Sequence, residues 1–245
     1  YAPNISLDKE HGIGNWSALD FVNAVKFGVT PAGEHLYPAF PYYSYQRMKV
    51  EDILDLKAYL DTLPPVANDP PKTSLPFPFS IRRGVGLWKL LYIDGETFQP
   101  DPAASDEINH GAYLVRGPGH CGECHTPRNL ILGPDESRAL AGGPSLEGRG
   151  SVPNITPDKE TGIGKMTLDD FMFNVFTFGM NIDGKPISSG GMGKVLRELQ
   201  ALPEADQRAI VAYLMSRPPV RSAKPAADEA KPAAKPDAGP EAAAQ

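Results

Sequence analysis

A stretch of sequence that occurs twice limits the fold of this chain more than any other feature. Residues 2–16 read APNISLDKEHGIGNW, and residues 152–166 read VPNITPDKETGIGKM. Further along, residues 58–66 and 212–220 share AYL followed by PPV. Because the matched segments keep their order and nearly their spacing, we interpret the chain as two homologous domains in tandem.

The two copies differ in what precedes the PNI block. In the second copy a long segment precedes the block and contains Cys121, Cys124 and His125. In the first copy two residues precede it. A domain that starts in the middle of this pattern lacks part of its own core. We therefore predict that residues 1–66 form a truncated first domain without the cysteine motif of its sister.

Composition excludes several classes of protein. No apolar run in the sequence approaches the roughly 18 residues that a membrane-spanning helix needs. The net charge of −6 weighs against nucleic acid as a partner. Two cysteines cannot form a disulfide-rich scaffold. With 26 prolines among 245 residues, irregular loops are expected between the regular elements.

Apolar spacing favours helices throughout, and no segment is convincing as a strand. Helices are predicted over residues 17–27, 50–63, 82–92, 105–115, 167–178 and 203–216. The sequence therefore predicts an all-α fold. Its expected parts are the first domain, a Pro-rich linker with a short helix over 67–104, a second domain over 105–221, and a disordered Ala/Pro-rich tail over 222–245.

One motif carries specific chemistry. Cys121 and Cys124 lie three residues apart, and His125 follows at once. This spacing is typical of covalent haem attachment, in which each thiol adds to one vinyl group of the porphyrin. The adjacent histidine is then held beneath the iron as an axial ligand. The motif predicts one covalent haem c in this chain.

Two other uses of paired cysteines fit the sequence less well. A zinc site needs four ligands, and His110 and His120 would have to complete it in a strained arrangement. A redox-active pair of the thioredoxin kind needs a βαβ setting, which the helical pattern does not provide.

A methionine is the usual sixth ligand of an electron-transfer haem c. Met192 follows Ser188, Ser189 and two glycines, so that the backbone can approach a haem closely. Met180 lies in another predicted loop, and a distal His110 or His120 is a weaker alternative. Met192 is the predicted distal ligand.

Several segments together resemble class I cytochrome c domains: HGAYLV, CGECHTPRN, PNITPD, GGMGKV and DQRAIVAYL. The pattern is most similar to that of multi-haem cytochrome c subunits of bacterial membrane-associated dehydrogenases, such as alcohol and gluconate dehydrogenases. The similarity covers residues 106–219 well and residues 1–66 as a truncated sister. It implies two tandem cytochrome c-like domains with loop-rich helices around haem, and it gives Cys121, Cys124, His125 and Met192 the roles described above.

The resemblance implies further site residues. Pro127 matches a family proline whose carbonyl oxygen accepts a hydrogen bond from the proximal histidine. Asn154 and Ile155 match the loop along the haem edge. In the first copy Pro38 stands where Met192 would align, and Met48 follows ten residues later. Met48 is therefore either a ligand of a first haem or a core residue at the start of a helix.

The resulting hypothesis is an electron carrier, not an enzyme. It predicts single-electron transfer between a periplasmic or membrane-associated dehydrogenase and the respiratory chain, with a downstream cytochrome or oxidase as the second partner. The alternative is a haem redox enzyme such as a di-haem peroxidase or a thiosulfate-oxidising cytochrome. A second haem is expected if the natural protein has an intact first domain. The expected compartment is the periplasm, with any membrane contact made through a segment before Tyr1 or through a partner.

Overall fold

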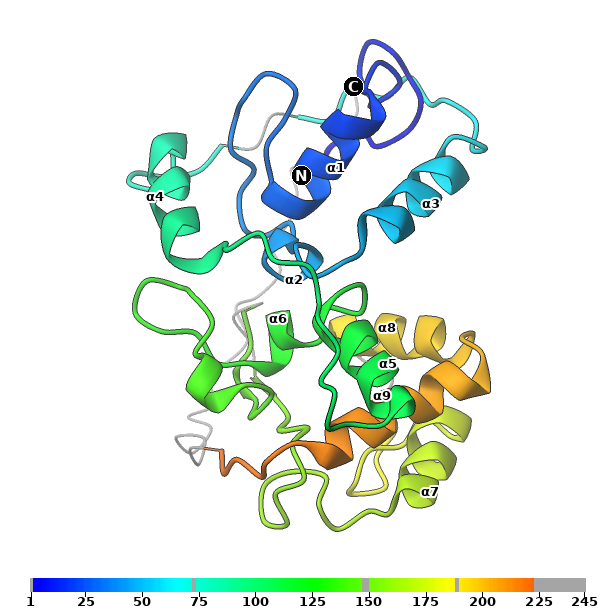
Figure 1. The fold of residues 1–245 in the computed structure, drawn as a ribbon. Helices are drawn as coiled ribbons and strands as arrows, with labels where there is room; N and C mark the ends of the chain where they lie inside the picture. Colours follow the sequence, from blue (N-terminus) through cyan, green and yellow to red (C-terminus); the bar gives the residue numbers. More distant parts are fainter. Residues whose placement is uncertain (1, 72–73, 147–149, 188–189, 223–245) are drawn as a thin grey trace, which may run out of the picture.

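The computed structural model describes residues 2–71, 74–146, 150–187 and 190–222. It is helix-rich, as predicted, and its helices gather into an upper and a lower group joined by an extended segment (Figure 1). The predicted disordered tail lies outside the described residues, apart from its first residue. No helix in the described part of the chain is long and apolar enough to cross a bilayer.

The N-terminal half contains four helices: α1 (Ala18–Phe27), α2 (Tyr42–Tyr45), α3 (Val50–Leu60) and α4 (Arg82–Tyr92). The Ser17 hydroxyl accepts a hydrogen bond from the amide of Asp20, whose carboxylate in turn accepts one from the Ser17 amide. This reciprocal cap fixes the start of α1. Gly28 ends the helix in a left-handed conformation that glycine adopts without strain.

The C-terminal half contains more and shorter elements. They are α5 (Asp106–Arg116), α6 (Gly122–His125), the 3₁₀ turn η1 (Glu136–Arg138), β1 (Gly143–Pro144), β2 (Ser151–Val152), α7 (Leu168–Phe171), the π-helical η2 (Met172–Thr177), α8 (Gly190–Gln200) and α9 (Glu204–Ser216). The strands β1 and β2 pair antiparallel, with Gly143 opposite Val152. This short ribbon is the regular sheet structure of the described chain, and the sequence did not indicate it.

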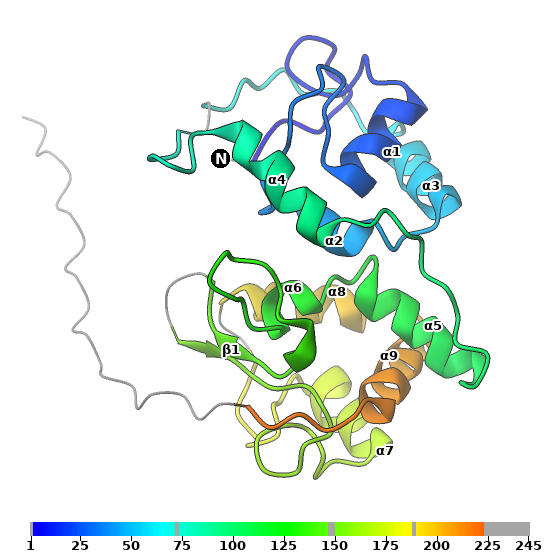
Figure 2. The same cartoon turned by 60° about the vertical axis from the view of Figure 1, so that its left-hand side comes forward.

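A glycine sets the crossing of α5 and α9, which make the most extensive helix–helix contact among the described elements (Figure 2). A Cβ atom on Gly111 would lie 1.8 Å from the carbonyl oxygen of Ala209 and 2.9 Å from Cβ of Tyr213. The absence of a side chain at Gly111 therefore lets the two backbones approach each other directly. Around this crossing lies the C-terminal core, which includes Val115, Phe176 and Val211.

The two copies of the repeat make matching hydrogen bonds. In each copy the asparagine amide and the hydroxyl two residues later bond to the valine of the PPV segment: Asn4 and Ser6 to Val66, and Asn154 and Thr156 to Val220. Each repeat block is thereby tied to the far end of its own copy. The copies differ in burial, because Asn154 is buried and Asn4 is only partly so.

Replacing Asn154 by alanine is expected to lower the free energy of unfolding by about 2 kcal/mol, because the buried Thr156 amide and the part-buried Val220 carbonyl and Thr161 hydroxyl lose their bonds to its side chain. The matched change Asn4→Ala removes two solvent-exposed bonds and one part-buried bond from the Ser6 amide, and it is expected to cost about 1 kcal/mol. Denaturant titration of both variants measures the difference. Equal losses would show that burial does not decide the strength of these bonds.

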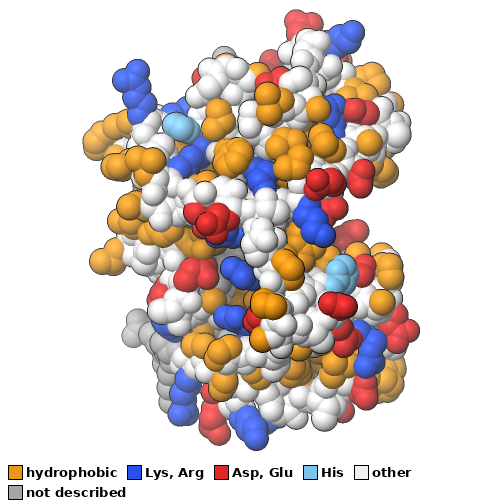
Figure 3. Space-filling model, in the orientation of Figure 1, with side chains coloured by type: hydrophobic (Ala, Val, Ile, Leu, Met, Phe, Trp, Pro, Cys, Tyr) orange, Lys and Arg blue, Asp and Glu red, His pale blue; other side chains and the backbone are white. Residues whose placement is uncertain are grey.

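The helix α4 and the segment after it fold back onto the N-terminal half. Lys89 is buried, and its ammonium group donates to the carbonyl oxygens of Phe27 and Gly28, at 2.6 Å each. Arg47 pairs with Asp94 at 2.6 Å beyond the end of α4. Part of the predicted linker is thus packed structure, and Figure 3 shows hydrophobic side chains on the outer surface over α4.

The helix α8 was not predicted, because Gly190, Gly191 and Gly193 at its start indicate a loop. The periodic signal lies further on, where Leu196 is buried and Leu199 packs against the same core. The helix predicted over 167–178 is α-helical only in its first turn, α7, and continues as the π-helical stretch η2. The other predicted helices are confirmed to within a few residues at their ends.

Candidate functional site

The cysteine motif lies on a single helical turn. Cys121 precedes α6, and its amide donates to the Val115 carbonyl at 3.1 Å, which ties the motif to the end of α5. Cys124 and His125 lie three and four residues after Cys121, and such spacing places side chains on one face of a helix. The two thiols and the imidazole are therefore brought together by local backbone geometry.

His125 is buried, and its ring is held in place by a backbone carbonyl. Its Nδ1 lies 2.8 Å from the carbonyl oxygen of Pro153. Nδ1 as donor leaves Nε2 without a proton, which is the form that binds a metal. Burial lowers the pKa of His125 below its usual value, partly opposed by the bond to Pro153, so the ring is neutral at pH 7. The imidazole is thus oriented and deprotonated for metal ligation.

The prediction that Pro127 supplies this carbonyl is wrong. The carbonyl oxygen of Pro127 accepts a hydrogen bond from the Asp135 amide at 2.8 Å. The β1–β2 ribbon instead brings Pro153 back to the imidazole, while the Gly142 amide donates to the His125 carbonyl at 2.7 Å.

The surroundings of the motif disfavour the two alternative uses of its cysteines. Burial raises the pKa of Cys121 to about 11, whereas a redox-active thiol needs a lowered pKa. His110 bonds to Asp206 at 2.8 Å between α5 and α9, and the His120 ring contacts that of Tyr45. Within the ranges that the structure describes, no group of three histidine, cysteine or acidic residues could hold a metal ion.

The methionines that the sequence places in the core lie there, whereas the local structure around Met192 differs from the prediction. Met166, Met172 and Met215 pack against the C-terminal core, as expected of core residues. Met192 is half-buried in the first turn of α8, so the prediction that it lies in a loop is wrong. Met180 lies in a loop, where it forms an isolated bridge with Pro186. The role of Met192 as distal ligand stays a prediction.

The remaining predicted residues fall into two places. Asn154 and Ile155 directly follow Pro153, so they share the loop that orients His125, and the Ile155 amide donates to the Leu140 carbonyl at 3.0 Å. Met48 is buried in the N-terminal core, just before α3. Its carbonyl oxygen accepts a hydrogen bond from the buried Lys26 ammonium at 2.8 Å.

A buried ion pair inside the motif was missed by the sequence analysis. Glu123, between the two cysteines, pairs with Arg128 at 2.6 Å, and both side chains are almost buried. The hydroxyl of Ser44 on α2 donates to the Glu123 carboxylate at 2.9 Å. An acidic residue followed five positions later by arginine gives no recognisable signal, since the pairing depends on the turn after α6.

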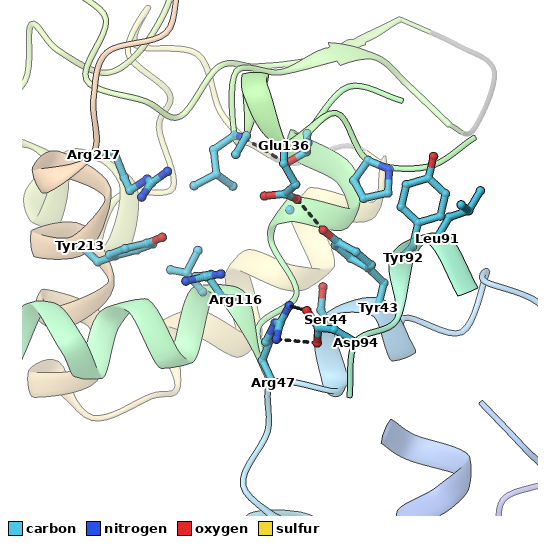
Figure 4. A pocket seen from close by; sticks show the side chains of 16 residues that line it. Tyr43, Ser44, Arg47, Leu91, Tyr92, Asp94, Arg116, Glu136, Tyr213 and Arg217 are labelled. Carbon is cyan, nitrogen blue, oxygen red and sulfur yellow. Dashed lines mark hydrogen bonds and ion pairs between the residues drawn. The ribbon is translucent and has the colours of Figure 1, made fainter. Parts of the chain in front are cut away.

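The N-terminal half packs on the outside of this same turn. A cavity of about 550 Å³ lies between the halves and is lined by Gly122 and Thr126 of the motif region together with residues of α2 and α4. Figure 4 shows Tyr43 pointing across it to Glu136, with a distance of 2.7 Å between the tyrosine hydroxyl and the carboxylate. Because Ser44 bonds to Glu123, the segment containing α2 contacts the backbone that carries the cysteines.

The residues present fit a covalently attached haem. A neutral, buried imidazole lies beside two thiols on one helical turn, and a carbonyl fixes its outer nitrogen. Helices α5 and α9 cross tightly behind this turn. A helical fold with this arrangement defines a c-type cytochrome.

Comparison with known proteins agrees with that class, although no family model matches the chain. The chain is 44% identical over 219 residues to the diheme cytochrome c-type protein of Cereibacter sphaeroides, covering 89% of this chain and 71% of the relative. It is 42% identical to the fructose dehydrogenase cytochrome subunit of Gluconobacter japonicus (89% and 44% covered). It is 36% identical to the gluconate 2-dehydrogenase cytochrome c subunit of Pantoea cypripedii (88% and 50% covered).

The chain therefore belongs to the family of c-type cytochromes that includes this dihaem protein. Its cofactor is haem c, and its function is electron transfer rather than catalysis on a substrate. The chain spans at most half the length of the two dehydrogenase subunits.

Proposed function

We propose that the chain binds one haem through Cys121 and Cys124, with His125 and Met192 as axial ligands. The observation that carries this proposal is the bond between Nδ1 of the buried His125 and the Pro153 carbonyl, on the helical turn that also carries both cysteines. The bound haem supplies an iron that gains and loses one electron. The chain holds the imidazole in its neutral form, and its apolar surroundings exclude water from the histidine.

We further propose that the protein contains two tandem cytochrome c-like domains. Support comes from the matching hydrogen bonds of the two copies and from their two hydrophobic cores. The N-terminal half as given has no cysteine. If the natural protein attaches a first haem, Met48 is the candidate ligand on that side.

The proposed partners are a dehydrogenase as electron donor and a downstream cytochrome or oxidase as acceptor, in the periplasm. Support comes from the similarity to cytochrome subunits of fructose and gluconate dehydrogenases. The peroxidase alternative needs an exchangeable iron ligand. Carbon monoxide added to the reduced protein discriminates between the two, since a closed site with Met192 bound resists it.

Replacing Met192 by alanine is expected to leave the haem covalently attached but to lower its reduction potential. Loss of a thioether ligand is expected to change it by on the order of 0.1–0.3 V, a fraction of the range that axial ligands span. Potentiometric titration with optical detection measures the shift. Met180→Ala is the matched control and should keep the native potential. An unchanged potential in Met192→Ala would remove Met192 as ligand.

A further inference from the structure

The helix α4 buries a lysine and exposes a stripe of leucines, while Trp88 on its inner side packs against Tyr42. Its lysine, Lys89, is only 8% exposed, whereas Leu87, Leu90 and Leu91 are 67%, 80% and 63% exposed. Helical spacing places these three leucines on one stripe, because residues three and four apart share a face. On a surface helix the apolar stripe normally faces the core. The buried lysine fixes this orientation through its bonds to the carbonyls of Phe27 and Gly28.

A loop of the C-terminal half adds to the same surface. Leu130, Ile131 and Leu132 are three consecutive exposed apolar residues, and Leu130 is fully exposed. The loop lies against the end of α4, since the Asn129 amide donates to the Tyr92 hydroxyl at 2.8 Å. Figures 1 and 2 both show the loop beside α4. We call these six side chains on α4 and the loop the apolar edge.

Two arginines lie at one end of the apolar edge, although the chain as a whole is acidic, and the guanidinium of Arg82 lies 4.0 Å from the Glu34 carboxylate. Arg82 and Arg83 are exposed at the start of α4, and Phe77 and Phe79 are exposed just before them. Leucine and phenylalanine side chains bordered by arginines are typical of helices that lie in a bilayer interface. Arginine guanidinium groups complement the phosphates of anionic lipids. Figure 3 shows this hydrophobic side of the molecule at its left edge, over α4 and the loop.

The form of the apolar edge favours lipid over a protein partner. Its leucines project from a helix surface and a loop tip, and the three loop residues carry no hydrogen-bonding side chain. Protein interfaces combine an apolar centre with polar groups that pair across a rim. We propose that the apolar edge inserts into the surface of a membrane containing anionic lipids, so that α4 lies in the interface and the haem domain stays outside.

The test is binding of the haem-loaded full chain to lipid vesicles. Vesicles of phosphatidylglycerol mixed with phosphatidylcholine, and of phosphatidylcholine alone, are sedimented with the protein, and the bound haem is measured by its absorbance. Wild-type protein is expected to bind the mixed vesicles more strongly. The triple change Leu87→Ser, Leu90→Ser and Leu91→Ser should reduce the partition coefficient at least about tenfold.

Matched variants separate the apolar edge from general effects. Leu130→Ser with Ile131→Ser tests the loop independently of α4 and should also weaken binding. Arg82→Gln with Arg83→Gln should weaken binding to the mixed vesicles roughly tenfold and leave binding to neutral vesicles unchanged. Leu19→Ser removes an equally exposed leucine from α1 and should have no effect.

Two outcomes would overturn the proposal. The first is wild-type protein that binds neither kind of vesicle, which would leave a protein partner as the occupant of the apolar edge. The second is that the α4 variant and the loop variant both bind the vesicles as strongly as the wild-type protein does. Covalent haem content and far-ultraviolet circular dichroism of each variant establish that it is folded. Lipid binding and electron transfer are measured separately, so failure here leaves the proposed function intact.

Discussion

Changing Cys121 and Cys124 together to alanine is expected to abolish covalent haem. Each thiol supplies one bond to the porphyrin, and the sequence contains no other cysteine to replace them. Because haem fills part of the interior of such a small helical domain, the apoprotein should also unfold at much lower denaturant concentration. Haem staining of the denatured chain on a gel measures attachment, and circular dichroism measures stability.

The single changes provide the control for this experiment. Cys121→Ala and Cys124→Ala each leave one thiol, and each should keep some covalent haem with a shifted absorption band of its pyridine complex. Denaturation separates attached from merely bound haem. Covalent haem that survives the double change would disprove attachment at these two residues.

Adding a methyl group at Gly111 is expected to produce the largest loss of stability of any single change considered. The new Cβ would lie 1.8 Å from the Ala209 carbonyl oxygen, so α5 and α9 must move apart. Both atoms involved belong to the backbone or are fixed to it, so no rotamer relieves the clash. Gly111→Ala should cost about 3 kcal/mol or more in the free energy of unfolding, as measured by denaturant titration.

Gly84 provides the matched control on another helix. A Cβ atom added there meets nothing within 4 Å, so Gly84→Ala in α4 should raise stability by roughly 0.5–1 kcal/mol. If Gly111→Ala unfolds at the wild-type denaturant concentration, the close approach of α5 and α9 is not required for the fold.

Local signals made much of this structure predictable. Ser17 and Ser105 cap the helices that follow them, and Pro203 stands at the N-cap of α9. These features depend on a few neighbouring residues, so the sequence states them directly. The motif of Cys121, Cys124 and His125 is local in the same sense, because one helical turn brings its side chains together.

Features that depend on distant contacts were not predictable. The partner of the His125 ring is Pro153, which the β1–β2 ribbon brings back from 28 residues away. The same holds for Lys89, whose burial depends on carbonyls of α1 far earlier in the chain. Helical spacing predicts the stripe of leucines on α4, but it does not predict that the side carrying Lys89 faces the protein.

The count of covalent haems per chain tests the central claim most directly. The full chain is matured with the periplasmic haem-attachment machinery, and its haem is measured as the pyridine haemochrome against the protein concentration. One covalent haem per chain is the result that Cys121, Cys124 and His125 predict. A chain that carries no covalent haem under these conditions would contradict the assignment of this motif, and with it the proposed electron-transfer site.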